Sequence, residues 1–87
     1  MLLLINRYPK KVIAIAVGKT IKRLRKEKKI SQEFLADVIN SHQVYISEIE
    51  RGLKIPSLPI LQEIANAFGI SLTDLVSLIE QELQNLK

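Results

Sequence analysis

Residues 31–52, with the sequence SQEFLADVINSHQVYISEIERG, decide how this 87-residue chain folds. They predict two short amphipathic helices joined by a tight turn. Ser31 is a favourable N-cap for the first helix, and Asn40 tolerates the left-handed backbone conformation in which helices often end. Gly52 is equally suited to end the second helix. The residues between these signals are therefore expected to form the two helices.

Apolar residues recur at helical spacing within both predicted helices. On each helix they predict one face turned toward a core. These faces hold Phe34, Leu35, Val38 and Ile39 in the first helix and Val44, Tyr45, Ile46 and Ile49 in the second. Two helices of about two turns, joined by roughly three or four residues, match the helix-turn-helix motif.

The composition predicts a single all-helical domain. Hydrophobic residues make up 47% of the chain but aromatic residues only 5%, so the core is expected to be aliphatic. Glycine and proline are few, whereas good helix formers are abundant. The chain has no Cys, which excludes disulfides and thiolate metal sites, and its single His leaves no histidine cluster for zinc. We therefore expect no metal and no cofactor.

Positive charge is concentrated in the first third of the chain. Residues 1–29 hold ten Lys and Arg against one Glu, a balance of +9, whereas residues 30–87 hold three against eight acidic residues, a balance of −5. The basic block is a candidate footprint for phosphate, although a solvated helix face would have the same composition. Its most closely clustered cations are Lys19, Lys22, Arg23, Lys26, Lys28 and Lys29.

The apolar runs at residues 2–5 and 12–17 are too short to span a membrane, which takes about 20 residues. Their charge pattern does not match a signal peptide, so we expect a cytoplasmic protein. Residues 1–9 are expected to form an N-terminal arm that precedes the domain of residues 10–87. The sequence leaves open whether this arm is extended, pairs as a strand with a partner copy, or is a disordered tail.

Three further helices complete the predicted domain. One covers about residues 10–28, with a start that could also lie as late as Ala16. Another runs from the N-cap Ser57 to a stop at Gly69, and the last follows the N-cap Ser71.

The last helix, residues 72–87, carries more apolar surface than one small domain needs. Five of its residues follow the 4-3-4-3 spacing of a coiled-coil seam, namely Leu72, Val76, Ile79, Leu83 and Leu86. We interpret this seam as a dimer interface. The alternative is that the helix only closes the core of its own chain and frays after Glu80.

The sequence on both sides of the central stretch makes the pattern more specific. LRKEKKI precedes it at residues 24–30, and PSLPILQEIANAFGISLTDL follows it at residues 56–75. With these flanks, residues 17–76 resemble the phage-repressor-like (Xre-type) family of helix-turn-helix regulators. The run YISEIERG at residues 45–52 and the long last helix further resemble restriction–modification controller proteins. The resemblance implies an all-α, five-helix repressor-like bundle whose second motif helix enters the DNA major groove.

The same resemblance implies which residues would meet DNA. The base-reading candidates are Gln43, Val44 and Glu48, with His42 and Ser47 beside them. By its chemistry Gln43 could pair with adenine, Val44 could touch a thymine methyl group, and Glu48 could accept a hydrogen bond from cytosine. The alternatives are a solvated Gln43, a Val44 turned toward the core and a His42 that only caps its helix. The phosphate-binding candidates are Gln32, Tyr45, Arg51 and Lys54.

Arg25 and Glu50 match a pair that forms a buried salt bridge in the family; the alternative is two exposed charges. Two positions depart from the family pattern. Asn40 replaces the usual turn glycine, and Ser41 stands where the family usually buries an aliphatic residue. Residues 31–52 also carry four acidic residues against one Arg, a net charge of −3. Attraction for phosphate is therefore expected to come partly from outside the motif.

Taken with the resemblance, these features predict a sequence-specific DNA-binding transcriptional regulator. It would act as a homodimer on a palindromic operator, with two recognition helices about 34 Å apart. The alternative is an antitoxin-type interaction module that neutralises a protein partner through residues 2–5 and the last helix. Catalysis is not expected, because no nucleophile–base pair, metal cluster or phosphate loop is apparent.

Overall fold

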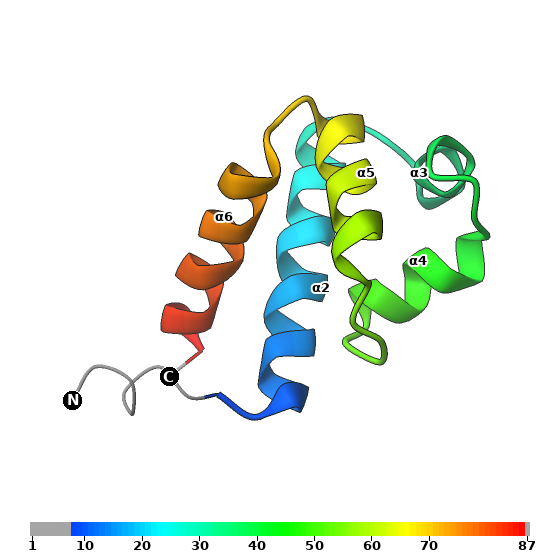
Figure 1. Ribbon diagram of the computed structural model, residues 1–87. Coiled ribbons are helices and arrows are strands. Elements are labelled where there is room, and N and C mark those ends of the chain that lie inside the picture. Colours follow the sequence, from blue (N-terminus) through cyan, green and yellow to red (C-terminus); the bar gives the residue numbers. More distant parts are fainter. Residues whose placement is uncertain (1–7, 87) are drawn as a thin grey trace.

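The computed structural model describes residues 8–86 of the chain, which form five helices and no strand (Figure 1). Residues 1–7, which include most of the predicted arm and the apolar run at 2–5, lie outside the described residues, as does residue 87. The helices are α2 (Lys10–Glu27), α3 (Gln32–Val38), α4 (Gln43–Glu50), α5 (Leu58–Phe68) and α6 (Leu72–Asn85). The prediction of an all-helical fold with five helices is confirmed.

Serine hydroxyls begin three of these helices, as predicted. The side chain of Ser31 accepts a hydrogen bond from the backbone N–H of Phe34 at 3.0 Å, and Ser71 accepts one from Asp74 at 3.0 Å. Ser57 caps α5 in the same way. Each hydroxyl satisfies a backbone N–H that has no acceptor within its helix. The helix starts are therefore encoded locally in the sequence.

The turn between α3 and α4 also follows the prediction. Asn40 has φ 56°, in the left-handed region that asparagine tolerates better than most side chains. The backbone N–H of Ser41 then donates to the carbonyl of Ala36 at 2.8 Å, which closes the end of α3. The turn is thus ordered although the usual glycine is absent.

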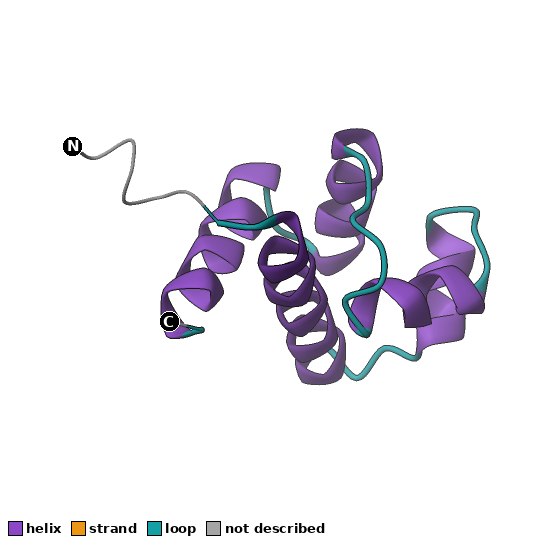
Figure 2. Cartoon of the chain, turned by 90° about the horizontal axis from the view of Figure 1, so that it is seen from below, coloured by secondary structure: helices purple, strands orange, loops and turns teal. Residues whose placement is uncertain are grey.

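The central helix of the bundle is α2 (Figure 1). It packs against α6 on one side and against α4 on the other, while α3 packs on α4 and α5 on α6. Seen from below, α2 separates α6 from the α3–α4 pair (Figure 2). The largest fully buried side chains come from all five helices: Phe68, Ile21, Leu35, Ile46, Ile49, Ile64 and Leu75. The core is aliphatic with a single phenylalanine, as the composition predicts.

Gly18 allows α2 and α4 to approach closely. A Cβ atom at this position would overlap the backbone carbonyl oxygens of Ile49 and Glu50 at the C-terminal end of α4. Backbone atoms cannot move away as a flexible side chain could, so a larger residue would force the helices apart. Gly18 therefore fixes where α4 crosses α2.

The predicted apolar faces of the motif helices are narrower than expected. Phe34, Val38 and Val44 are 57%, 50% and 66% exposed, so their assignment to the core-facing side was wrong. The prediction is confirmed for Leu35 and for Ile39, the C-cap residue of α3, and Ala36 is buried beside them. A helix of two turns at the edge of the bundle, packed mainly on α4 and α5, buries a narrow stripe, and residues flanking that stripe stay in solvent even when apolar.

The seam proposed for α6 is used largely within the chain. Ile79 is buried in the core, and Leu72, Leu83 and Leu86 pack against it, whereas Val76 is 39% exposed. The helix continues to Asn85, so the fraying after Glu80 that belonged to the alternative interpretation does not occur. None of the helices between residues 8 and 86 is long and apolar enough to cross a membrane.

Candidate nucleic-acid interface

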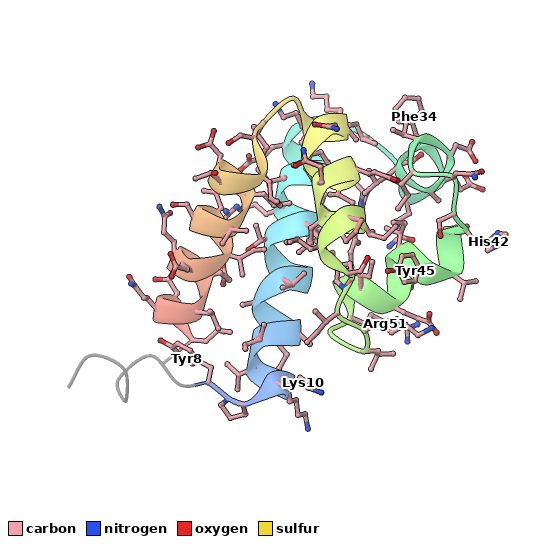
Figure 3. The ribbon with its side chains drawn as sticks, in the orientation of Figure 1. Tyr8, Lys10, Phe34, His42, Tyr45 and Arg51 are labelled. Carbon is pink, nitrogen blue, oxygen red and sulfur yellow. The ribbon has the colours of Figure 1, made fainter. Side chains whose placement is uncertain are left out.

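Helix α4 presents one face to solvent and uses the other to anchor itself. Ile46 and Ile49 are fully buried, while Gln43 and Val44 are exposed. His42 and Arg51 stand at opposite ends of this helix in Figure 3. The outward direction of Val44 excludes the alternative in which it turns toward the core. The exposed face is therefore the one that carries the base-reading candidates.

A buried ion pair holds the C-terminal end of α4. The guanidinium of Arg25, on α2, donates from Nε to Oε2 of Glu50 at 2.6 Å and from Nη2 to Oε1 at 3.0 Å. The two side chains are 11% and 3% exposed, so the predicted buried salt bridge is present. Hydrogen bonding to the Glu50 carboxylate raises the pKa of Arg25, against an opposing effect of burial and with added attraction from the same charge. A third bond runs from Nη1 to the carbonyl of Ile30 at 2.8 Å and ties the link before α3 to the pair.

A chain of hydrogen bonds connects this ion pair to the exposed N-terminal end of α4. Gln32, at the start of α3, donates from Nε2 to Oε1 of Glu50 at 3.0 Å. Its own Oε1 accepts a hydrogen bond from Nε2 of Gln43 at 3.2 Å. The order Arg25, Glu50, Gln32, Gln43 therefore links a buried charge to the first residue of α4. Such networks hold side-chain rotamers that would otherwise be free.

The other candidate residues meet along the second half of α4. Arg51 donates from Nε to the hydroxyl of Ser47 at 3.2 Å. Lys54 lies 3.1 Å from the carboxylate of Glu48 and 5.9 Å from the ring centre of Tyr45, which is a cation–π distance. Two base-reading candidates thus each contact a phosphate-binding candidate. These contacts keep the cations close to the exposed face.

His42 is the N-cap residue of α4, but its imidazole makes no capping hydrogen bond. The side chain is exposed and points away from the bundle in Figure 3. His42 thus stands at the N-cap position, exposed and without a side-chain partner, which agrees with the alternative of a surface cap and also leaves the imidazole accessible to DNA.

The clustered cations predicted at residues 19–29 divide into two groups. Arg23 faces α6, where it donates to Glu82 at 3.4 Å, and it also lies 3.9 Å from Glu27. The lysines of the same block are exposed, namely Lys19, Lys22, Lys26, Lys28 and Lys29. Arg23 consequently contributes to packing between helices rather than to an open basic surface.

Two features of the site had no signal in the sequence. The bond between Gln32 and Gln43 depends on how α3 and α4 cross, which residue spacing does not define. The glycine at position 18 gave no indication that it touches α4, because it lies 32 residues before the end of that helix. Within residues 8–86 there is no group of three or more His, Cys, Asp or Glu side chains that could hold a metal ion.

Comparison with known proteins agrees with this geometry. The chain is 44% identical over 71 residues to the control protein C.MunI of Mycoplasma sp, a match that covers 80% of this chain and 96% of that protein. It is 39% identical over 71 residues to the immunity repressor protein of Bacillus phage phi105, covering 78% of this chain. The chain spans about half of the repressor, 49% of its length.

Among solved structures, the restriction–modification controller protein C.Esp1396I superposes with a TM-score of 0.74 and 29% sequence identity, over 83% of this chain and 95% of that one. That structure is a tetramer in complex with its natural 35-base-pair operator. Residues 21–75, well over half of the chain, match the sequence pattern of the helix-turn-helix family HTH_3. The chain belongs to the HTH_3 family of helix-turn-helix proteins.

Proposed function

We propose that this protein is a sequence-specific DNA-binding transcriptional regulator that acts as a homodimer on a palindromic operator. Membership of the helix-turn-helix family and similarity to control and repressor proteins support DNA binding. The exposed face of α4 supports the choice of recognition helix, because a helix of this diameter fits the major groove. Occupancy of an operator near a promoter would then change the access of RNA polymerase.

The observation that carries the proposal is the hydrogen bond between Gln43 and Gln32. The Gln43 amide has two N–H donors and one oxygen acceptor, and Gln32 takes one of the donors. The remaining N–H and the oxygen match N7 and the N6 amino group of adenine. Gln43 is thus held with one N–H and its oxygen free, which lowers the entropy lost on binding.

The second half of α4 would exchange partners on binding. Lys54 and Arg51 are paired with Glu48 and Ser47 in the free protein. Backbone phosphates attract both cations, and their departure would free the carboxylate of Glu48 to accept from a cytosine amino group. Tyr45, beneath Lys54, has its hydroxyl available as a further phosphate donor.

The dimer interface proposed for α6 centres on Val76. This side chain lines a shallow hollow with Leu72 and Glu80, on the face of α6 that is turned away from the core. Because Ile79 is buried within the chain, it would not reach a partner. We therefore infer a helix-to-helix contact through Val76, flanked by Leu72, Leu83 and Leu86, rather than a full coiled coil. The operator-bound assembly of C.Esp1396I supports multiple copies on one duplex.

The test is selection of bound sequences from a pool of random duplex DNA. We expect an inverted repeat whose half-sites lie about 10 base pairs apart, one turn of the helix. A Gln43→Ala variant should lose preference at a defined base in each half-site, whereas Val38→Ala, at an exposed position on α3, should select the parent sequence. Recovery of no motif by the parent protein would contradict the proposal.

The antitoxin-type alternative has less support. Its proposed partner surface at residues 2–5 lies outside the described residues, and most of the α6 seam packs within the chain. Copurification with a distinct small protein, with both proteins released together by high salt or denaturant, would favour it over operator binding.

A further inference from the structure

Three lysines from two distant parts of the sequence lie around one hollow at the C-terminal end of α4. Lys10 and Lys11 form the first turn of α2, and Lys54 follows α4. All three line a shallow hollow whose floor includes Ala14 and Gly52. Lys10 lies at the same end of the molecule as Arg51 in Figure 3. We call Lys10, Lys11 and Lys54 the lysine corner.

The two α2 residues of the lysine corner have no acidic partner in the part of the chain that the structure describes. Within residues 8–86, neither Lys10 nor Lys11 has a carboxylate within 4.0 Å, and the first turn of α2 contains no acidic residue. The N-terminal end of a helix is already positive, so cations there are unfavourable for the helix itself. These two lysines therefore do not stabilise α2 electrostatically, and the corner suits an anion.

The length of α4 places the phosphates of a bound DNA strand beside the lysine corner. Its eight residues extend for about 12 Å, at roughly 1.5 Å per residue. The major groove is also about 12 Å wide. A recognition helix that crosses the groove therefore brings its C-terminal end close to the phosphates of one strand, where the lysine corner is.

We propose that Lys10 and Lys11 bind the phosphate backbone of DNA next to the C-terminal end of α4, together with Lys54. This inference rests on the proposed function and extends its footprint to the first turn of α2. It also assigns a source of attraction that residues 31–52, with a net charge of −3, lack. Because phosphate carries no sequence information, the contact would strengthen binding to all sites and leave base preference unchanged.

The test compares two variants that lose the same charge. In one, Lys10→Gln and Lys11→Gln are combined; in the control, Lys19→Gln and Lys26→Gln remove two exposed lysines of α2 that do not line the hollow. Affinity for the selected operator is measured as salt is raised. Each lost phosphate contact reduces the slope of log affinity against log salt by about 0.9. The corner variant loses two contacts in each of the two protomers on the operator, so its slope should fall by about 3.6. The control should lose less than about half of that.

The outcomes separate this proposal from the broader one. An equal loss of slope in both variants would assign the attraction to overall charge and overturn the lysine corner. An unchanged slope in the corner variant would do the same. Its thermal midpoint should be equal to or above that of the parent, and a lower midpoint would indicate a structural role instead. If the parent selects no operator, sequence-specific function fails, yet the same slopes measured on a random duplex still decide whether Lys10 and Lys11 bind phosphate.

Discussion

Replacing Arg25 by methionine is expected to lower the free energy of unfolding by about 3–5 kcal/mol. The guanidinium makes two bonds to Glu50 and one to the carbonyl of Ile30. Without it, the Glu50 carboxylate, whose side chain is 3% exposed, keeps only the hydrogen bond from Gln32. The cost arises mainly from leaving that charge buried without a cation, and less from the lost bonds themselves.

This loss is large compared with the stability expected for so small a protein. At about 0.05–0.15 kcal/mol per residue, a chain of this size has roughly 4–13 kcal/mol in total. The Arg25→Met variant should therefore be marginal at room temperature. Urea unfolding followed by circular dichroism measures the change in the free energy of unfolding. If the slope of that free energy against urea concentration equals that of the parent, the variant exposes the same amount of surface on unfolding.

Two controls make the reasoning refutable. Arg23→Met removes an exposed arginine that also contacts a glutamate, and it should cost less than about 1 kcal/mol. The double variant of Arg25→Met with Glu50→Met should be more stable than Arg25→Met alone, because it no longer buries a single charge. A cost below about 1 kcal/mol for Arg25→Met, or effects of the two substitutions that simply add, would refute a buried and coupled ion pair.

Three further predictions concern other contacts. Gly18→Ala should destabilise the protein by about 1–3 kcal/mol in urea unfolding despite the better helix propensity of alanine, because the added methyl group meets backbone atoms of α4; a gain in stability would exclude the close crossing. Gln32→Ala should weaken operator binding by about fivefold, and adding it to Gln43→Ala should cause little further loss in a binding titration, because both act through one amide; full additivity would show that they act separately. Val76→Glu should weaken self-association by at least about tenfold in sedimentation equilibrium, whereas Gln84→Glu, elsewhere on α6, should not; equal association of both variants would move the dimer interface off Val76.

Much of the fold could be predicted because its signals are local. Ser31, Ser57 and Ser71 begin helices by accepting a hydrogen bond from the backbone N–H three positions later, so both partners lie within one short stretch of sequence. Asn40 and Gly69 mark helix ends for a similar reason, since their residue types tolerate positive φ. Local chemistry thus defined the boundaries of the helices well.

Burial was harder to predict because it depends on neighbours. Phe34 and Val38 have the right spacing for an apolar face, but α3 is covered by other helices only along Leu35, Ala36 and Ile39. On α6, the heptad spacing correctly indicated a continuous apolar face. It could not show whether that face packs against the chain's own core or against a partner. For Ile79 it is the chain's own core.

In the candidate site, too, some contacts could be predicted from the sequence and others depend on how the helices pack. The resemblance to the repressor family indicated the Arg25–Glu50 pair, and the structure contains it. The contacts of Gln32 with Glu50 and Gln43 depend on how α3 packs against both ends of α4, so no local sequence pattern predicted them. The base and phosphate contacts themselves stay predictions that binding measurements decide.

The distribution of charge along α4 predicts that a single copy binds DNA weakly. At its N-terminal end, Glu33 and Asp37 of α3 line a hollow shared with Gln43. At its C-terminal end, Arg51 and Lys54 are exposed, and Lys10 and Lys11 of the lysine corner lie beside Lys54. Positive charge is therefore concentrated at one end of α4, the proposed recognition helix. Because the logarithm of affinity grows with the number of phosphate contacts, two copies on one duplex would double that number, so dimerisation would supply attraction as well as a second set of base contacts.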